Sequence, residues 1–125
     1  MRGILDTSIL IARESPDADD LPDDLAVSVM TLAELHVGVL LADASTRAPR
    51  TARLVEAERN FEAVPVSVPV ARAFAALVAE ARRSRRRPRV TDTLIAATAL
   101  AHGVPVYTRD RDFARMAGVE VILVG

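Results

Sequence analysis

Short apolar segments alternate with longer segments of helical periodicity, and this alternation limits the possible folds more than any other feature of the chain. The first apolar segment, Gly3–Leu5, stops at Asp6. Further short apolar segments occur at residues 25–28, 63–66, 104–108 and 120–124. Such alternation is typical of βαβ units that build a parallel sheet. We predict an α/β fold with a central, mostly parallel sheet flanked by helices, as one domain over residues 1–125.

The segments between these strands have the spacing of helices. The first expected helix begins at Ser8, and the next two cover about 31–42 and 47–61. A long helix is expected from Val70 through an arginine cluster, followed by helices at 91–101 and 110–116. Gly103 is expected to end the helix at 91–101 as its C-cap. Pro65 would remove a hydrogen-bond donor from its strand, so we place that strand at a sheet edge. The polar segment 15–24 is expected to be a loop.

Four acidic residues are expected along one rim of this sheet. Asp6 follows the first strand and Asp110 follows a later one, whereas Glu34 and Asp92 lie in the first turns of two helices. Right-handed crossovers place strand carboxyl ends and the following helix starts on the same rim, where open parallel sheets bind ligands. The four carboxylates are therefore predicted to converge.

Each acid alone has a simpler explanation as a helix cap. Asp6, Asp110 and either Thr91 or Asp92 could be N-caps, and Thr31 with Glu34 could form a capping box. Together, however, four carboxylates would repel one another unless a cation neutralised them. The chain contains no lysine and no cysteine. Since His36 and His102 lack the spacing of metal ligands, an all-oxygen site for Mg²⁺ or Mn²⁺ is predicted.

Composition excludes several other classes of protein. All 16 residues counted as lysine or arginine are arginine, which excludes a P-loop, a Schiff base and a phosphoreceiver site. Without cysteine there is no disulfide and no thiolate chemistry. The chain becomes acidic too early for a signal peptide, and no apolar run approaches the ~20 residues of a membrane span. We expect a soluble cytoplasmic protein without membrane contact.

Charge is distributed unevenly along the chain. Two arginines and nine acids occur through Thr46, but fourteen arginines and eight acids from Arg47 onward. The densest positive segment precedes Asp92, and its arginines are candidates for contact with the phosphates of a nucleic acid: Arg82, Arg83, Arg85, Arg86, Arg87 and Arg89. A solvated helix end is the equally weighted alternative. Aromatic residues make up only 3%, so base stacking is expected to contribute little.

The ordered motifs of the chain resemble those of the PIN-domain family, specifically the VapC-type toxins of bacterial toxin–antitoxin pairs. The motifs are Asp6-Thr7-Ser8, Thr31-Leu32-Ala33-Glu34-Leu35, Asp92-Thr93-Leu94-Ile95-Ala96-Ala97 and Thr108-Arg109-Asp110-Arg111-Asp112-Phe113. They occur in the family's order over nearly the whole chain. The resemblance implies a Mg²⁺- or Mn²⁺-dependent endoribonuclease that cleaves structured RNA, tRNA or rRNA, and arrests translation.

The resemblance also implies roles for individual residues. Asp6 and Asp92 would bind metal directly, and Glu34 and Asp110 would complete the shell or orient the nucleophile. Hydroxyl groups expected to hold these carboxylates belong to Thr7, Ser8 and Thr108. Asp112 is the alternative to Asp110 as the fourth acid. If Asp110 is the fourth acid, Asp112 is expected to interact with the dipole of its helix and to support the metal ligands without binding the metal.

Partners follow from the same resemblance. A VapB-type antitoxin is expected to cover the site, with helix 32–41 and residues 9–11 as candidate contacts, and the toxin is expected to form homodimers and toxin–antitoxin hetero-oligomers. The main competing function is a catalytically inactive PIN-like module that binds RNA or a partner. A DNA nuclease is the other alternative, because metal chemistry alone does not distinguish the sugars. A haloacid-dehalogenase-like phosphatase is excluded because Ser8 stands where it needs a second Asp.

Overall fold

A parallel sheet forms the centre of the protein in the computed structural model, which describes residues 1–11 and 21–125. Its strands are β1 (Gly3–Leu5), β2 (Leu25–Ser28), β3 (Glu62–Val64), β4 (Val106–Thr108) and β5 (Val121–Leu123). They lie in the order β3-β2-β1-β4-β5, and every neighbouring pair is parallel. The predicted α/β fold is confirmed, as is the edge position of the third strand.

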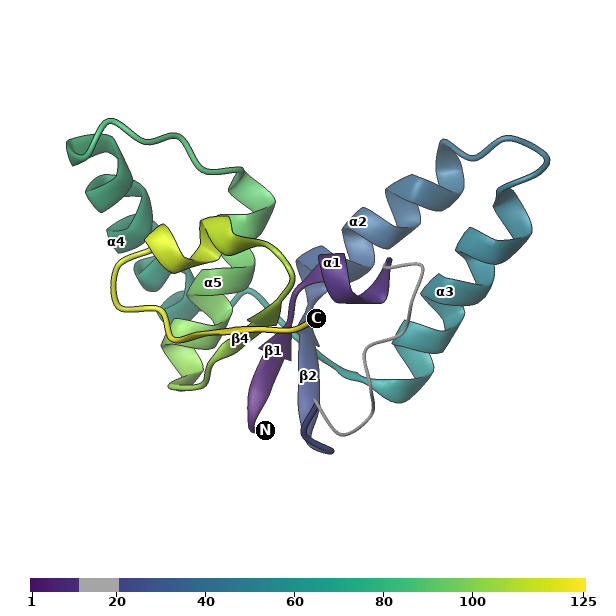
Figure 1. Ribbon diagram of the computed structural model, residues 1–125, viewed down its shortest axis with the longest axis horizontal. Helices are drawn as coiled ribbons and strands as arrows, with labels where there is room; N and C mark the ends of the chain where they lie inside the picture. Colours follow the sequence, from purple (N-terminus) through teal and green to yellow (C-terminus); the bar gives the residue numbers. More distant parts are fainter. Residues whose placement is uncertain (12–20) are drawn as a thin grey trace.

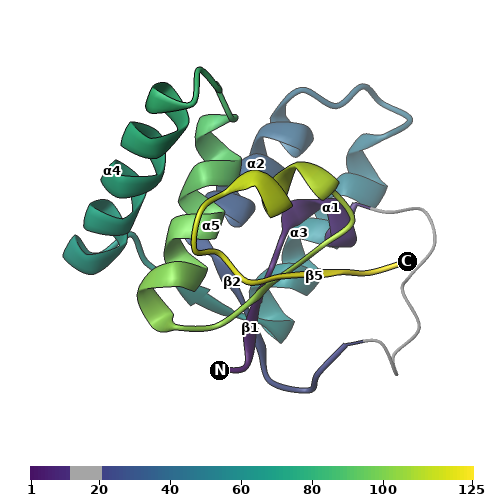
Figure 2. The same cartoon turned by 60° about the vertical axis from the view of Figure 1, so that its left-hand side comes forward.

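Helices cover both sides of this sheet. They are α1 (Thr7–Leu10), α2 (Val29–Leu40), α3 (Arg47–Asn60), α4 (Val68–Arg83), α5 (Val90–His102) and the 3₁₀ helix η2 (Arg111–Arg115). Figure 1 shows α4 and α5 on one side of β1 and β2, and the α2–α3 pair on the other. After rotation, η2 and the C-terminal segment lie in front of β1 (Figure 2).

Alternation along the strands produces two apolar layers. Ile4 packs in a cluster with α4, α5 and Phe113, whereas Leu5 packs with Ile9, Val27 and Val124. Both strand residues are at most 1% exposed. Burial on both faces fixes the register of β1, because a shift by one residue would exchange its two faces. The residue that follows β1 is therefore held firmly at the sheet rim.

The predicted bounds of two helices were wrong. Helix α2 begins at Val29, since the Ser28 side chain accepts a hydrogen bond from the Met30 amide at 3.1 Å. Thr31 is therefore inside the helix, the predicted capping box does not form, and Glu34 lies in the second turn. Helix α4 starts earlier than predicted, at Val68, and ends at Arg83 rather than continuing through the arginine cluster.

The arginine cluster leaves the helix because the backbone turns there. Arg85 adopts φ +55°, and the Arg86 amide donates to the Ala81 carbonyl at 2.7 Å. This pairing satisfies a carbonyl at the helix end, as in a Schellman motif. The remaining cluster residues consequently belong to the connection between α4 and α5.

Other boundaries differ by a few residues. Pro65 lies outside β3, the strands at 104–108 and 120–124 are shorter than predicted, and the last helix is a 3₁₀ helix. Gly103 does cap α5, with φ +66°. Most of the predicted loop at 15–24 lies outside the described residues. No helix in the described ranges is long and apolar enough to cross a membrane.

Candidate active site

Asp6 lies at the point where the sheet topology reverses. It directly follows β1, which pairs with β2 on one side and β4 on the other. Its side chain is 3% exposed and accepts a hydrogen bond from the Thr108 hydroxyl at 2.8 Å. Although Asp6 occupies the N-cap position of α1, its side chain makes no capping hydrogen bond. The carboxylate thus lies, largely buried, at the rim where parallel sheets bind ligands.

The end of β4 places a second acid close to Asp6. The Thr108 oxygen that donates to Asp6 also accepts from the Asp110 amide at 3.0 Å. Ser8 supports this turn, because its hydroxyl accepts from the Arg109 amide at 3.2 Å. Asp110 itself caps η2 by accepting from the Asp112 amide at 2.9 Å. The expected capping role of Asp110 therefore coexists with its position beside the site.

Glu34 is brought to the site by a contact between helices. The Thr7 hydroxyl donates to Glu34 Oε1 at 2.8 Å and lies 3.1 Å from the Thr31 hydroxyl oxygen. Thr7 and Thr31 are both buried. Glu34 thus faces α1 instead of returning to its own helix start. Its other oxygen, Oε2, lies 3.7 Å from Arg89 Nη2.

Asp92 lies in the first turn of α5, as predicted, but does not cap that helix. The N-cap is Arg89, and it makes no side-chain capping bond. The pKa of Asp92 is raised from 3.8 to about 6, chiefly by burial and next by the negative charge of Asp6. Glu34 and Asp110 raise this pKa further, while Arg89 lowers it. All four predicted acids therefore share one electrostatic environment.

The oxygen donors of these four side chains are chemically suited to a hard divalent cation. Carboxylates are the donors that Mg²⁺ and Mn²⁺ prefer, and a cation among them would remove the repulsion that raises the Asp92 pKa. Arg89, whose side chain is 73% exposed, is the residue that contributes positive charge to both Asp92 and Glu34. However, over residues 1–11 and 21–125, no group of three or more His, Asp or Glu side chains already has metal-binding geometry.

Asp112 differs from Asp110 in its surroundings. It is exposed, and its charge is not among those that shift the Asp92 pKa. It lines a small cavity with Arg86, Arg87 and Arg115. The structure thus places Asp110 with the acid group, and Asp112 on the side facing the arginine connection.

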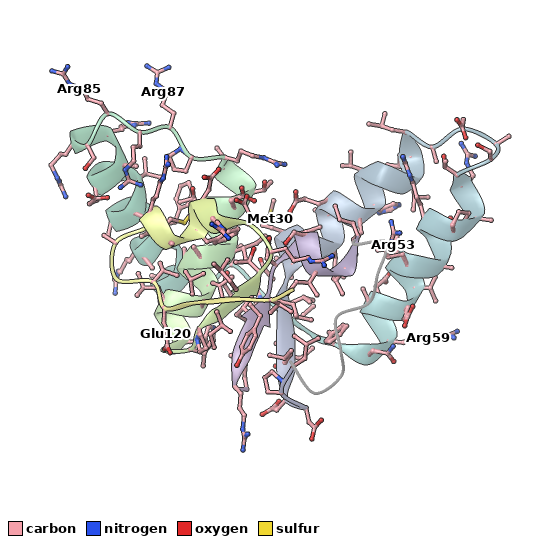
Figure 3. The ribbon with its side chains drawn as sticks, viewed as in Figure 1. Met30, Arg53, Arg59, Arg85, Arg87 and Glu120 are labelled. Atoms are coloured by element: carbon pink, nitrogen blue, oxygen red, sulfur yellow. The ribbon has the colours of Figure 1, made fainter. Side chains whose placement is uncertain are left out.

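The candidate RNA-binding arginines lie at the end of α4 and in the connection that leads to α5. Arg82, Arg83, Arg85, Arg87 and Arg89 are exposed, while the partly buried Arg86 pairs with Glu80. In Figure 3 the side chains of Arg85 and Arg87 extend away from the protein. Only Arg89 of this group contacts an acid of the site within the described residues. The sequence indicated the cluster but not this ion pair.

A cavity beside Glu34 was not anticipated. It has a volume of about 310 Å³ and lies where α1, α2 and α3 meet. Arg50 and Arg53 contribute its positive charge, and Arg50 Nη1 donates to the Gly38 carbonyl at 2.8 Å. The sequence signal for this cavity was the three-residue spacing of Arg50 and Arg53, which places both side chains on one face of α3. Positive charge therefore lies on two sides of the acids: the arginine connection between α4 and α5 on one side, and the two α3 arginines of this cavity on the other.

Comparisons with known proteins agree with this architecture. The PIN domain profile matches residues 3–119. Ribonuclease VapC5 of Mycobacterium tuberculosis is 45% identical over 98% of this chain and 95% of its own length; Ribonuclease VapC4 of the same organism is 39% identical over 98% and 97%. The crystal structure of VapBC-5 from M. tuberculosis aligns with TM-score 0.88 and 44% identity over 98% of each chain. FitAcB from Neisseria gonorrhoeae aligns with TM-score 0.79 and 28% identity over 96% of each chain.

Proposed function

The chain belongs to the PIN-domain family and, within it, to the VapC ribonucleases, and from this premise we propose that it is a toxin that cleaves structured RNA with Mg²⁺ or Mn²⁺. The single observation that carries the proposal is the placement of four acids around the carboxyl end of β1, where Thr108 contacts Asp6 and Asp110, Thr7 contacts Glu34, and the charges of these three acids act with burial to raise the pKa of Asp92. Such a group of charges is costly without a cation and useful with one. We assign the metal-binding and catalytic roles to Asp6, Glu34, Asp92 and Asp110.

These residues divide the work of hydrolysis. Asp6 and Asp92 would hold the cation directly, and Glu34 and Asp110 would complete its shell or orient the attacking water. When bound, the cation supplies positive charge that promotes ionisation of water and stabilises the phosphodiester as it is cleaved. The Thr108 hydroxyl, at 2.8 Å from Asp6, and the Thr7 hydroxyl, at 2.8 Å from Glu34, fix the orientation of their carboxylates.

The substrate we propose is structured cellular RNA, either tRNA or an rRNA loop, whose cleavage stops translation. Exposed arginines between α4 and α5 would bind its phosphates on one side of the acids. Because binding by arginine releases counterions from the RNA, affinity should decrease steeply with salt. The four acids alone would repel RNA, so these arginines and the cation are both needed for approach.

A VapB-type antitoxin is the proposed protein partner. Ile11, Val37, Leu40 and Leu41 are apolar residues with at least half of their surface exposed. Val37 and Leu40 lie in α2, Leu41 directly follows α2, and Ile11 directly follows α1. Ile11 and α2 also border the cavity that contains Glu34 and Arg53. An apolar antitoxin segment with an acidic end would fit this surface and block access to Glu34. Homodimers and toxin–antitoxin hetero-oligomers are proposed for the assembled system.

The test is cleavage of total bacterial RNA by protein freed of antitoxin. Wild type with Mg²⁺ or Mn²⁺ should produce discrete cuts, mapped by sequencing the new ends. EDTA and Asp6→Ala should each abolish them, whereas the exposed Asp112→Asn should retain most cleavage. Absence of cutting by folded, metal-loaded wild type would instead favour a PIN-like module that only binds RNA or a partner. Equal cutting of DNA would identify a nuclease without sugar selectivity.

A further inference from the structure

A second cavity lies beside the arginine connection, on the flank of α5 away from the α2–α3 pair. It has a volume of about 520 Å³, within the ~300–1,000 Å³ typical of small-ligand sites. Its apolar lining comes from both helices and the connection: Phe74, Val78, Ala81, Pro88 and Val90. We call this the α4–α5 cavity. It is separate from the cavity beside Glu34, which α1, α2 and α3 line.

Positive charge surrounds the α4–α5 cavity. Arg82, Arg86 and Arg87 line it together with the apolar residues. Among the described residues, Arg86 is held by Glu80, while neither Arg82 nor Arg87 forms an ion pair. Arg87 and Pro88 also line the neighbouring cavity that contains Arg115. An apolar recess that is also lined by guanidinium groups matches a ligand with a flat apolar face and an attached anion.

The cavity is also adjacent to the candidate active site. Val90 and Thr93, from the first turn of α5, form part of its lining, and Asp92 lies in the same turn. Arg89, which precedes this turn, contacts Glu34. A ligand in the cavity would thus be held within one helical turn of Asp92, one of the acids that we assign to cleavage.

We propose that the α4–α5 cavity binds one unpaired nucleotide of the substrate RNA, with the base against Phe74 and Val78 and its phosphate on Arg82 and Arg87. The proposal rests on the proposed function and names its substrate class: RNA with an unstacked nucleotide close to the cut. RNA is usually read at such nucleotides, because bases inside an A-form duplex are inaccessible. Phe74 then contributes to binding, contrary to the expectation that stacking contributes little.

The first experiment detects the base separately from the phosphate. Adenosine and uridine 5′-monophosphate are titrated into ¹⁵N-labelled wild type in EDTA, with inorganic phosphate as control. Nucleotides should shift the amides of Phe74, Val78 and Val90, and phosphate alone should not. Equal shifts with inorganic phosphate would overturn the proposal.

The second experiment measures selection of unpaired RNA in EDTA, so that cleavage does not contribute. We expect a labelled RNA hairpin to bind about tenfold more tightly than a duplex of equal length, the effect of one stacked base. Val78→Glu should remove this preference by placing a negative charge in the cavity. Val55→Glu, which makes the same change on α3, should preserve it. Arg87→Ala should weaken hairpin binding more than Arg59→Ala, which removes another exposed arginine, far away on α3 (Figure 3).

The outcomes separate this inference from the proposed function. If metal-dependent cleavage is intact and Val78→Glu, shown to be folded by circular dichroism, still prefers the hairpin, the cavity proposal is wrong and the ribonuclease proposal stands. If Val78→Glu instead converts a dimer to a monomer without changing hairpin preference, a second copy covers the cavity and the proposal also fails. Retained hairpin preference in a chain that cuts no RNA would refute only the ribonuclease proposal.

Discussion

Replacing Asp92 by asparagine should stabilise the metal-free protein while destroying its metal site. The pKa of Asp92 rises from 3.8 to about 6, chiefly through burial and the charge of Asp6. Without any correction, this shift means that the folded protein is destabilised by ~3 kcal/mol when Asp92 is ionised. Solvent screening of the partly exposed carboxyl about halves that figure, and the loss of a favourable charge at a helix N-terminus removes ~0.5 kcal/mol more. We expect Asp92→Asn to gain about 1 kcal/mol at pH 7.5.

The gain should depend on pH in a defined window. A raised folded-state pKa favours folding below the unfolded value, 3.8, and this contribution is lost as pH rises through about 6. The advantage of asparagine should therefore be absent near pH 4 and complete above pH 7. Urea denaturation in EDTA at pH 4.5, 6 and 7.5 measures it, with Asp112→Asn as control. A melting temperature higher by about 3–5 °C at pH 7.5 is the corresponding thermal result.

Divalent metal should reverse the order of stability. Mg²⁺ at 100 times its dissociation constant adds about 2.7 kcal/mol to a protein that binds it only when folded. Wild type should therefore exceed Asp92→Asn in stability once metal is added. An asparagine variant that is less stable than wild type in EDTA at pH 7.5, or a gain independent of pH, would refute the electrostatic account of this site.

Three further substitutions test the supporting structure. Thr108→Val should cost about 1–3 kcal/mol in urea denaturation and reduce cleavage, because Asp6 loses its hydrogen-bond donor; unchanged stability and cleavage would contradict this. Arg85→Gly should raise stability by about 1 kcal/mol, since Arg85 has φ +55°, and a lower melting temperature would argue against it. Gly3→Ala should cost about 1–3 kcal/mol because the added methyl would collide with the Tyr107 ring; equal stability would show that the ring moves aside freely.

The sheet and its acids could be predicted because they follow from general rules of chain topology. Alternating apolar segments indicated parallel strands, and parallel strands bring their carboxyl ends to one rim. That was enough to expect Asp6 and Asp110 near each other. Gly103 was equally predictable, since a left-handed C-cap favours glycine.

Contacts between distant segments could not be predicted in the same way. The pattern Thr31-x-x-Glu34 satisfies a local capping rule, but Ser28 caps the helix and Thr7, 27 residues away, takes the Glu34 side chain. Likewise, nothing in the arginine run indicated that Arg85 would turn the chain out of α4. The α4–α5 cavity depends on that turn and on how two helices pack, and neither is encoded within one segment.

Calorimetric titration of Mn²⁺ into metal-free protein at pH 7 tests most directly the claim that the four gathered carboxylates form a metal site. Wild type and Asp112→Asn should bind Mn²⁺ with similar affinity, whereas Asp6→Asn and Asp92→Asn should lose measurable binding while remaining folded. At pH 6, binding to wild type should also release protons, because Asp92, with a pKa of about 6, is then partly protonated. Failure of folded wild type to bind Mn²⁺, or undiminished binding by Asp92→Asn, would contradict the account.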